Sequence, residues 1–263
     1  MKRWSERPHP GRLWNRLALS VTFIALAGIG ATKPAYAASG FGQQPASGIV
    51  AQARASMASA GSVSASGTGT MSIPGIGKVT ISETDYSGQT SGSQLLKVTS
   101  AHATAVALPS ASTLEVGGDL YTDANLSFWT SAGLARPQAA LLAGRWVHIP
   151  PGSSLYASVA ADLTMPSLLG DLFDARIYHK GAVHQVDGVR ALKISYDNTG
   201  GDAGPATCFI AVGGRHLPVS VTLGSLTLRL RSWGRTQTLS APASFVPLPT
   251  LVPSSQAVGA IAA

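Results

Sequence analysis

Residues 217–231, LPVSVTLGSLTLRLR, decide the fold of this chain. Apolar and polar side chains alternate through the stretch: Val219, Val221 and Leu223 are separated by Ser220 and Thr222, and three leucines follow in the same rhythm, at positions 226, 228 and 230. Successive side chains of a strand point to opposite faces of a sheet, so a period of two gives one buried face and one wet face. The stretch therefore predicts neighbouring strands of an antiparallel sheet.

The same alternation extends upstream. Leu192, Ile194 and Tyr196 point to one side of a strand and their neighbours to the other. Gly117-Gly118 separates two short alternating runs and is typical of a two-residue hairpin turn. Further strands are expected at residues 62–71, 78–86, 94–99, 103–108, 113–116, 119–122, 182–189 and 207–212.

Helical periodicity interrupts this pattern twice. An apolar stripe predicts a helix over residues 47–60 that ends at Gly61, and two more helices are expected at 134–142 and 154–173. Pro166 should divide the last of them, because proline cannot donate to the i−4 carbonyl. An extended connection is expected over residues 144–151. The order favours an α+β fold: a curved antiparallel sheet (a half-open β-barrel) with helices on its concave face, in one domain over residues 48–248.

The first 37 residues are expected to be a signal peptide. A basic segment is followed by an apolar run over residues 17–31 and then by Ala35 and Ala37, at −3 and −1 of a cut before Ala38. Residues 38–47 would be a flexible lead-in. The chain is thus expected to be extracellular or in the cell envelope, exported by the general secretion route. The apolar run reaches only about 22 Å as a helix, short for a ~30 Å hydrocarbon core, and an uncleaved signal anchor is the alternative.

Charge and cysteine content narrow the functions further. The first 37 residues hold six of the 19 basic side chains and one of the 12 acidic ones, which leaves 13 and 11 for the rest. A nearly neutral body argues against nucleic-acid binding. Cys208, the single cysteine, lies in an apolar run and should be a buried thiol. No cysteine follows the signal, so no lipid anchor is expected, although membrane contact stays possible.

Residues from Pro242 onward should be poorly ordered, with residues 249–263 a disordered tail.

Signatures of catalysis are missing. No Gly-x-Ser-x-Gly elbow occurs, and the glycines of residues 67–69 and 75–77 lack the spacing of nucleotide-binding loops. His179 and His184 could hold a metal across a hairpin, but surface histidines are the better interpretation. Asp171 and Asp174 are better explained as a solvated helix face than as an acid–base pair. We expect no enzyme activity, no cofactor and no metal.

Several short motifs in a fixed order carry a family resemblance. They cover residues 49–248 and are Gly118-Asp-Leu-Tyr121, Phe128-Trp129, Leu142-Ala-Gly-Arg-Trp-Val147, Val186-Asp-Gly-Val189, His216-Leu-Pro-Val219, and Trp233-Gly234 before Ala241-Pro242. In this order the chain resembles the LolA/LppX-like family of bacterial envelope lipoprotein carriers and lipid-binding proteins, in its actinobacterial branch. The resemblance implies a half-open barrel whose concave side, lidded by helices, holds acyl chains. The chain departs from the lipidated members by lacking the cysteine after the signal.

We therefore expect a protein that binds or carries a hydrophobic ligand with acyl chains in a cavity between sheet and helices. The expected cavity lining is Trp129, Trp146, Leu163, Leu168, Leu172, Phe173, Leu192, Ile194 and Tyr196. The competing interpretation is that these side chains fill a solid core. A non-catalytic sensing or regulatory envelope module, binding a protein or peptide partner, is the main alternative function. An enzyme acting on envelope polymers is a third hypothesis.

Overall fold

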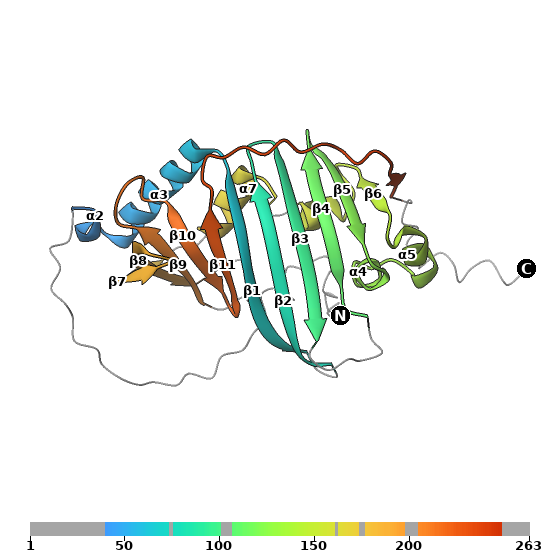
Figure 1. Cartoon of the computed structure of the whole chain (residues 1–263), viewed down its shortest axis with the longest axis horizontal. Helices are drawn as coiled ribbons and strands as arrows, with labels where there is room; N and C mark the ends of the chain where they lie inside the picture. Colours follow the sequence, from blue (N-terminus) through green and yellow to red (C-terminus); the bar gives the residue numbers. More distant parts are fainter. Residues whose placement is uncertain are drawn as a thin grey trace, which may run out of the picture.

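One open sheet organises the molecule. The structure is a computed structural model that describes residues 40–248, apart from residues 74–75, 101–106, 161–162, 174–176 and 198–204. The expected signal peptide, the expected strand at 103–108 and the expected tail at 249–263 therefore lie wholly or mostly outside the described residues. Twelve strands join in the order β12-β6-β5-β4-β3-β2-β1-β11-β10-β9-β8-β7 (Figure 1). The strands are β1 (Val63–Ile73), β2 (Gly77–Ser87), β3 (Ser91–Ser100), β4 (Ser110–Val116), β5 (Asp119–Ala124), β6 (Trp146–Ile149), β7 (Tyr178–Val186), β8 (Val189–Asp197), β9 (Pro205–Ala211), β10 (Pro218–Leu223), β11 (Leu226–Arg231) and β12 (Val246–Pro247).

The sheet confirms the predicted α+β class. Every strand pairing is antiparallel except that of β12 with β6, which is parallel, so the sheet is mixed and it does not close. Gly117 and Gly118 make the predicted hairpin turn between β4 and β5, with φ angles of 63° and 88° that an L side chain disfavours.

Six helices accompany the sheet in the described part of the chain. They are α2 (Gly40–Gln43), α3 (Ala46–Ala60), α4 (Leu126–Ser131), α5 (Arg136–Leu142), α6 (Tyr156–Val159) and α7 (Met165–Leu172). None of the described helices is long and apolar enough to cross a membrane. Pro166 divides the helical region as predicted, because it lies in the first turn of α7, where its missing N–H costs nothing.

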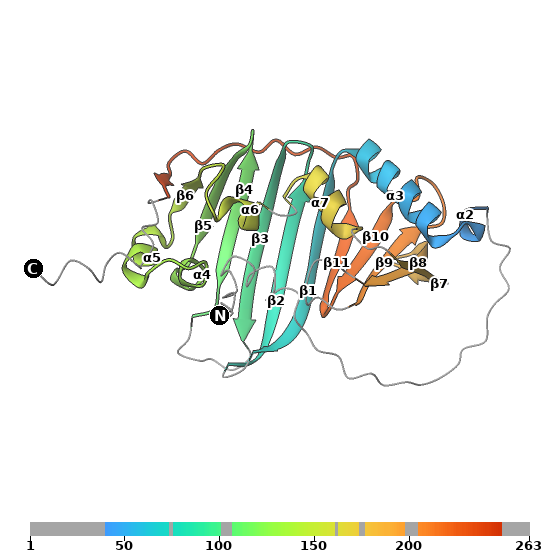
Figure 2. The same cartoon turned by 180° about the vertical axis from the view of Figure 1, so that it is seen from behind.

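The helices lie on one side of the sheet. α7 is behind the strands in Figure 1 and in front of them in Figure 2, where α6 is also in front. α3 packs mainly on α7 and β7, while α4 packs mainly on α5 and β4. The side of the sheet that carries the helices is called the inner face below, and the opposite side the outer face.

Strand register assigns each side chain to a face. Val63 and Ala65 of β1 pack in one cluster with Met57 of α3, so the odd-numbered residues of β1 face inward. Gly67 pairs with Glu83, Glu83 with Leu96, and Leu96 with Ala111. Cross-strand partners share a face, so this row of residues faces inward as well.

The apolar core on the inner face is divided into three clusters. The largest joins α3 and α7 to β1 and β8–β11, and it contains Met57, Phe173, Ile194 and Cys208. A second joins α4–α6 to β4–β6 around Trp129. A third consists of Met71, Val79 and Ile81, with Leu96 and Val98 packed against it. The sheet thus has two flanks, each filled by its own helices, and a middle section formed by β1–β3.

Three expectations about local structure need correction. Residues 38–47 were expected to be a flexible lead-in, but they include helix α2, whose Phe41 is buried in the largest apolar cluster. Asn125 begins a helix, α4, that periodicity did not reveal: its side-chain oxygen accepts a hydrogen bond from the N–H of Phe128 at 3.0 Å. Residues 242–248 were expected to be poorly ordered, which is wrong. Val246 pairs with Val147 of β6, and the ring of Phe245 lies edge-on to Tyr121 at 5.1 Å between centroids.

Residues 232–248 form a strap along one end of the sheet, from β11 to β6 (Figures 1 and 2). Gly234 N–H donates to the Ser62 carbonyl at 2.9 Å, and Gln237 N–H donates to the hydroxyl of Tyr86 at 2.9 Å. The strap therefore connects the two flanks of the sheet through contacts with β1 and β2.

Candidate functional site

The nine residues predicted to line a cavity fall into three places. Trp129 and Leu163 lie in the cluster of α4–α6, and both are almost fully buried. Trp146 is on the outer face, because its neighbour Val147 on β6 is buried on the inner face. The remaining six lie in the cluster of α3 and α7, and they are Leu168, Leu172, Phe173, Leu192, Ile194 and Tyr196.

The six residues of the α3/α7 flank make a tightly connected wall. Phe173 and Tyr196 have ring centroids 6.1 Å apart, and the Tyr196 hydroxyl donates a hydrogen bond to the Leu172 carbonyl. Burial raises the pKa of the Tyr196 phenol, so this hydroxyl remains a donor. Cys208 beside them is fully buried, as predicted, and burial raises the pKa of its thiol. The residues therefore serve the packing of α7 on β8 and β9.

Leu163 has a different role, because its backbone lies directly on β3. A Cβ at Gly92 would overlap the Leu163 carbonyl oxygen, so only glycine permits this approach. Met165 N–H then donates to the Gly88 carbonyl at 2.8 Å, and Thr164 forms a parallel bridge to Gly88. The linker from α6 to α7 is thereby hydrogen-bonded to the turn between β2 and β3.

Between the flanks, the inner face of β1–β3 combines apolar and polar side chains. We call this region the central inner face and define it as Met71 of β1, Val79, Ile81, Glu83 and Asp85 of β2, and Gln94, Leu96 and Val98 of β3. Their common face follows from the register, in which Val79, Ile81, Glu83 and Asp85 alternate along one side of β2. The apolar members lie toward one end of the strands and the polar members toward the other.

The polar members form one hydrogen-bonded group. The Gln94 side-chain amide donates to the Glu83 carboxylate at 2.8 Å, and Glu83 also shares a hydrogen bond with Asp85. Desolvation raises the pKa of Glu83, while these two hydrogen bonds lower it and only partly compensate. Burial therefore favours the protonated form of Glu83.

Glu83 and Asp85 were not among the residues predicted from the sequence, although a signal was present. Val79 and Ile81 start an apolar alternation on β2, and the next two residues of the same parity are carboxylates. Charged side chains rarely point toward a core unless they are paired. Two consecutive inward positions with carboxylates therefore mark either an acid pair or a polar site.

The other candidate groups are separated from one another in the part of the chain that the structure describes. In the described ranges no three His, Cys, Asp or Glu side chains could hold a metal ion. His179 and His184 lie on the exposed strand β7, where the His184 ring packs edge-on against Phe209 at 5.6 Å. Asp174 and the side chain of Asp171 lie outside the described residues.

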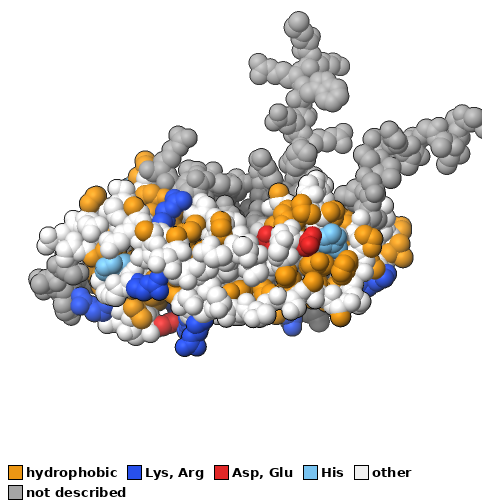
Figure 3. Space-filling view, turned by 90° about the horizontal axis from the view of Figure 1, so that it is seen from above, with side chains coloured by type: hydrophobic (Ala, Val, Ile, Leu, Met, Phe, Trp, Pro, Cys, Tyr) orange, Lys and Arg blue, Asp and Glu red, His pale blue; other side chains and the backbone are white. Residues whose placement is uncertain are grey.

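His148 belongs to a small surface patch on the outer face. Its Nε2 lies 3.1 Å from the Asp119 carboxylate, and its ring is flanked by Tyr121 and Phe245. Figure 3 shows, from above, an apolar patch with acidic and histidine side chains at the end of the molecule where β5 and β6 lie. Because the strap supplies Phe245, this patch fastens β12 to the sheet.

No protein-family model and no curated protein sequence matches the chain. Solved structures match at low sequence identity. LprF from Mycobacterium bovis is 16% identical over 76% of this chain and 97% of its own, with a TM-score of 0.45. A LolA superfamily protein from Nitrosomonas europaea is 10% identical over 73% of this chain and 94% of its own, with a TM-score of 0.30.

A putative outer membrane lipoprotein-sorting protein domain from Vibrio parahaemolyticus is 13% identical and has a TM-score of 0.27, covering 67% of this chain and 72% of its own. These matches include a LolA superfamily protein, and none of the three reaches a TM-score of 0.5. The likeness carries over no residue role.

Proposed function

We propose that this protein is a non-catalytic carrier that holds an amphiphile with acyl chains against its central inner face, in the cell envelope. The observation that supports the proposal is the divided core. A sheet of this size ordinarily has one contiguous core, whereas here two helix-filled flanks are separated by a middle section of mixed polarity. The arrangement suits a ligand that is itself part apolar and part polar.

The two ends of the central inner face suit the two ends of such a ligand. Acyl chains would lie against Met71, Ile81, Leu96 and Val98, and a polar head group would reach Glu83 and its hydrogen-bonded neighbours. Each buried methylene contributes about 0.8 kcal/mol, so two acyl chains bind strongly without further polar chemistry. Binding in this mode needs no catalytic group.

The residues predicted from the sequence would then form the side walls of the site. Trp129 and Leu163 would bound it on the α4–α6 flank. The set formed by Leu168, Leu172, Phe173, Leu192, Ile194 and Tyr196 would bound it on the α3/α7 flank. Trp146 faces the outer side of β6, so the proposed site leaves it out.

Neighbouring leucines on β3 provide a matched experiment. Leu96 is half-buried on the inner face, while Leu95 is 50% exposed on the outer face. Leu96→Arg places a charge where the acyl chains would lie, and Leu95→Arg places the same charge in water. We expect native mass spectrometry of the exported protein to show copurifying lipid in the natural protein and in Leu95→Arg, with at least a tenfold lower bound fraction in Leu96→Arg.

Circular dichroism of both variants establishes that each is folded before the comparison is made. A lipid-free natural protein that also fails to take up a fluorescent fatty acid would overturn the carrier proposal. Copurification of a protein or peptide in place of lipid would favour the sensing or regulatory alternative.

A further inference from the structure

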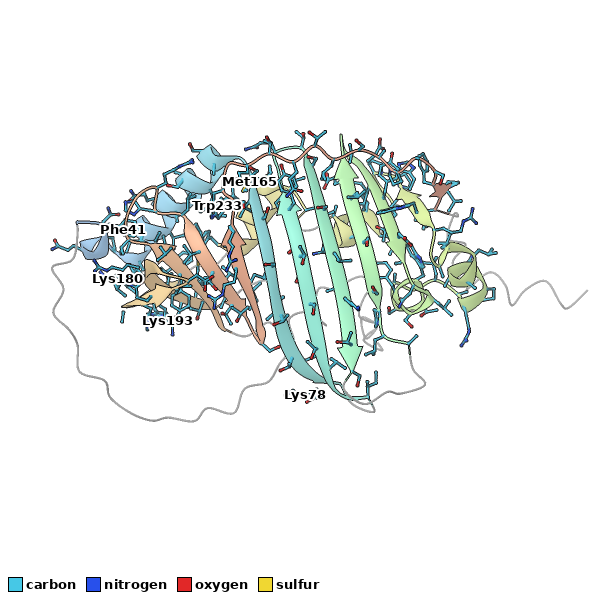
Figure 4. All side chains as sticks on the ribbon, in the orientation of Figure 1. Phe41, Lys78, Met165, Lys180, Lys193 and Trp233 are labelled. Carbon is cyan, nitrogen blue, oxygen red and sulfur yellow. The ribbon has the colours of Figure 1, made fainter. Side chains whose placement is uncertain are left out.

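The charged side chains of β2–β4 are divided between the two faces of the sheet. Three half-buried carboxyl groups lie on the inner face, and they are Glu83, Asp85 and Glu115. The two lysines of these strands have the opposite parity. Lys97 is on the outer face of β3, and Lys78 is on the outer face at the lower end of β2 (Figure 4). Within the described residues of β1–β6, the inner face therefore carries acidic side chains and no lysine or arginine.

Glu83 has no cation beside it in the part of the chain that the structure describes. Burial raises its pKa, and the side chains that act on it are Asp85 and Gln94, both through hydrogen bonds. A hydrogen bond from the neutral amide of Gln94 leaves the charge of a carboxylate in place, whereas a buried charge is ordinarily paired with an opposite one. The ionised form of Glu83 therefore lacks a counter-charge.

The backbone next to Glu83 also presents an acceptor. Gly67 is the direct partner of Glu83 on β1, and a Cβ at this glycine would overlap the Thr227 carbonyl oxygen. Because Gly67 faces inward, this oxygen lies on the inner side of β1, at the level of Glu83. Carboxyl and carbonyl oxygens brought together in this way suit a ligand group that supplies hydrogen-bond donors.

The acidic end of the central inner face adjoins the apolar end on a single strand. Ile81 is the inward neighbour of Glu83 on β2, and it belongs to the cluster with Met71 and Val79. None of the described helices contributes a residue to this cluster, whereas the other two clusters are filled by helices. A ligand with one apolar chain and one polar head group can therefore contact both ends at once.

Three kinds of head group can be compared for this place. An ammonium group brings a positive charge and only N–H donors, as the lysine side chain does. A phosphate or carboxylate brings acceptors and a second negative charge, which Glu83 repels. A hydroxyl can donate one hydrogen bond but leaves the charge of Glu83 unpaired. The ammonium group is the one that matches both the charge and the acceptors.

We propose that the amphiphile carried on the central inner face has an amine head group, whose ammonium pairs with Glu83 while its chain lies against Ile81 and the apolar cluster. This inference rests on the carrier proposal, because it names the head group of the same ligand. It predicts an order of affinity by charge: cationic head groups bind most tightly, neutral ones less tightly and anionic ones least.

The test uses the exported chain and three probes that share one alkyl chain: decylamine, decanol and decanoate. Isothermal titration calorimetry at neutral pH and constant salt measures each affinity. We expect the natural protein to bind decylamine at least about tenfold more tightly than decanoate, with decanol between them. Glu83→Gln keeps the shape of the side chain and should remove this preference. Glu83→Lys reverses the charge and should bind decanoate more tightly than decylamine.

Asp123→Asn is the matched control, because Asp123 pairs with Trp146 on the outer face of β5 and β6. This variant should keep the preference of the natural protein for decylamine. Circular dichroism establishes that each variant is folded, and Glu83→Gln alone decides the outcome if Glu83→Lys does not fold.

Similar affinities of the natural protein for all three probes, or a preference for decanoate, would overturn the amine assignment and leave the carrier proposal standing. A preference for decylamine that persists in Glu83→Gln would overturn it too, because the amine would then bind elsewhere. If none of the three probes binds, the carrier proposal fails together with this inference.

Discussion

At the scale of single residues, the acid pair on the inner face is the most consequential arrangement. Glu83 continues a strand face that begins with Val79 and Ile81, and it is stabilised there by Gln94. Since burial raises the pKa of Glu83 above its ordinary value of 4.5, folding favours its protonated form. Its contribution to stability is therefore fully present below pH 4.5 and is lost as the pH rises through the folded-state value.

Glu83→Gln should remove this dependence. A neutral amide carries no desolvation penalty of charge, so the variant should be more stable than the natural protein at pH 7, and the difference should vanish below about pH 4. Urea denaturation from pH 3.5 to 7.5 measures it. Asp187→Asn is the control of opposite sign, because the pKa of Asp187 is lowered: this variant should be the less stable one at neutral pH, with the gap closing as the pH falls. A constant difference between Glu83→Gln and the natural protein at every pH would refute the raised pKa of Glu83.

At the scale of elements, regular alternation predicted the strands well. The runs around Val221 and Leu228 are β10 and β11, which pair with each other over residues 220–223 and 226–229. The pairing of β10 with β9 is irregular between Pro218 and Ser220. Short elements defined by distant contacts were missed. β12 is a strand only because its two residues pair with β6. α4 is a helix of six residues whose first turn is capped by the Asn125 side chain. Both elements are too short for a periodic pattern of apolar residues to be recognised in the sequence.

The candidate site was less predictable than the fold for a related reason. Large apolar side chains such as Trp129 and Phe173 are predicted to be buried, but their sequence positions do not show which of the two flanks each one packs in. The inward carboxylates could be recognised only once the parity of β2 was known. Register, which is a property of paired strands, decides both questions.

Asn125 offers a test at this scale. Its side chain accepts from Phe128 N–H at 3.0 Å and Ser110 N–H at 3.3 Å, and donates to the Leu108 carbonyl at 2.6 Å. Asn125→Ala removes all three bonds and should cost about 2 kcal/mol in the free energy of unfolding. Asn125→Asp keeps the two accepted bonds and should lie between the two proteins in urea denaturation. Equal stabilities of the two variants would contradict the capping role.

At the scale of the whole molecule, the seam between β1 and β11 joins the middle section of the sheet to the α3/α7 flank. The paired register ends at Thr68 and Thr227, and the strands cross closely there. A Cβ at Gly67 would overlap the Thr227 carbonyl oxygen, and one at Gly69 would lie 2.7 Å from the Leu226 Cα. Both neighbours are backbone atoms, which cannot move aside as a side chain can.

Gly67→Ala should therefore destabilise the molecule by at least about 2 kcal/mol, because one methyl group forces the two halves of the sheet apart. Gly170 in α7 has open space around its Cα, so Gly170→Ala is the control and should be neutral or stabilising by up to about 1 kcal/mol. Chemical denaturation followed by tryptophan fluorescence measures both. A Gly67→Ala protein as stable as its control would mean that the seam yields without strain.

The position of β1 inside the sheet also governs the order in which the chain can assemble. β2 follows β1 immediately, but the partner on its other side, β11, comes more than 150 residues later. While the polypeptide is being synthesised and exported, the edge of β1 that pairs with β11 lacks its strand partner. Its backbone amide and carbonyl groups cannot form their interstrand hydrogen bonds until residues 226–231 are available. A chain halted before that point presents an open template to other unfinished copies, so the cell has a reason to shield this intermediate until its last strands arrive.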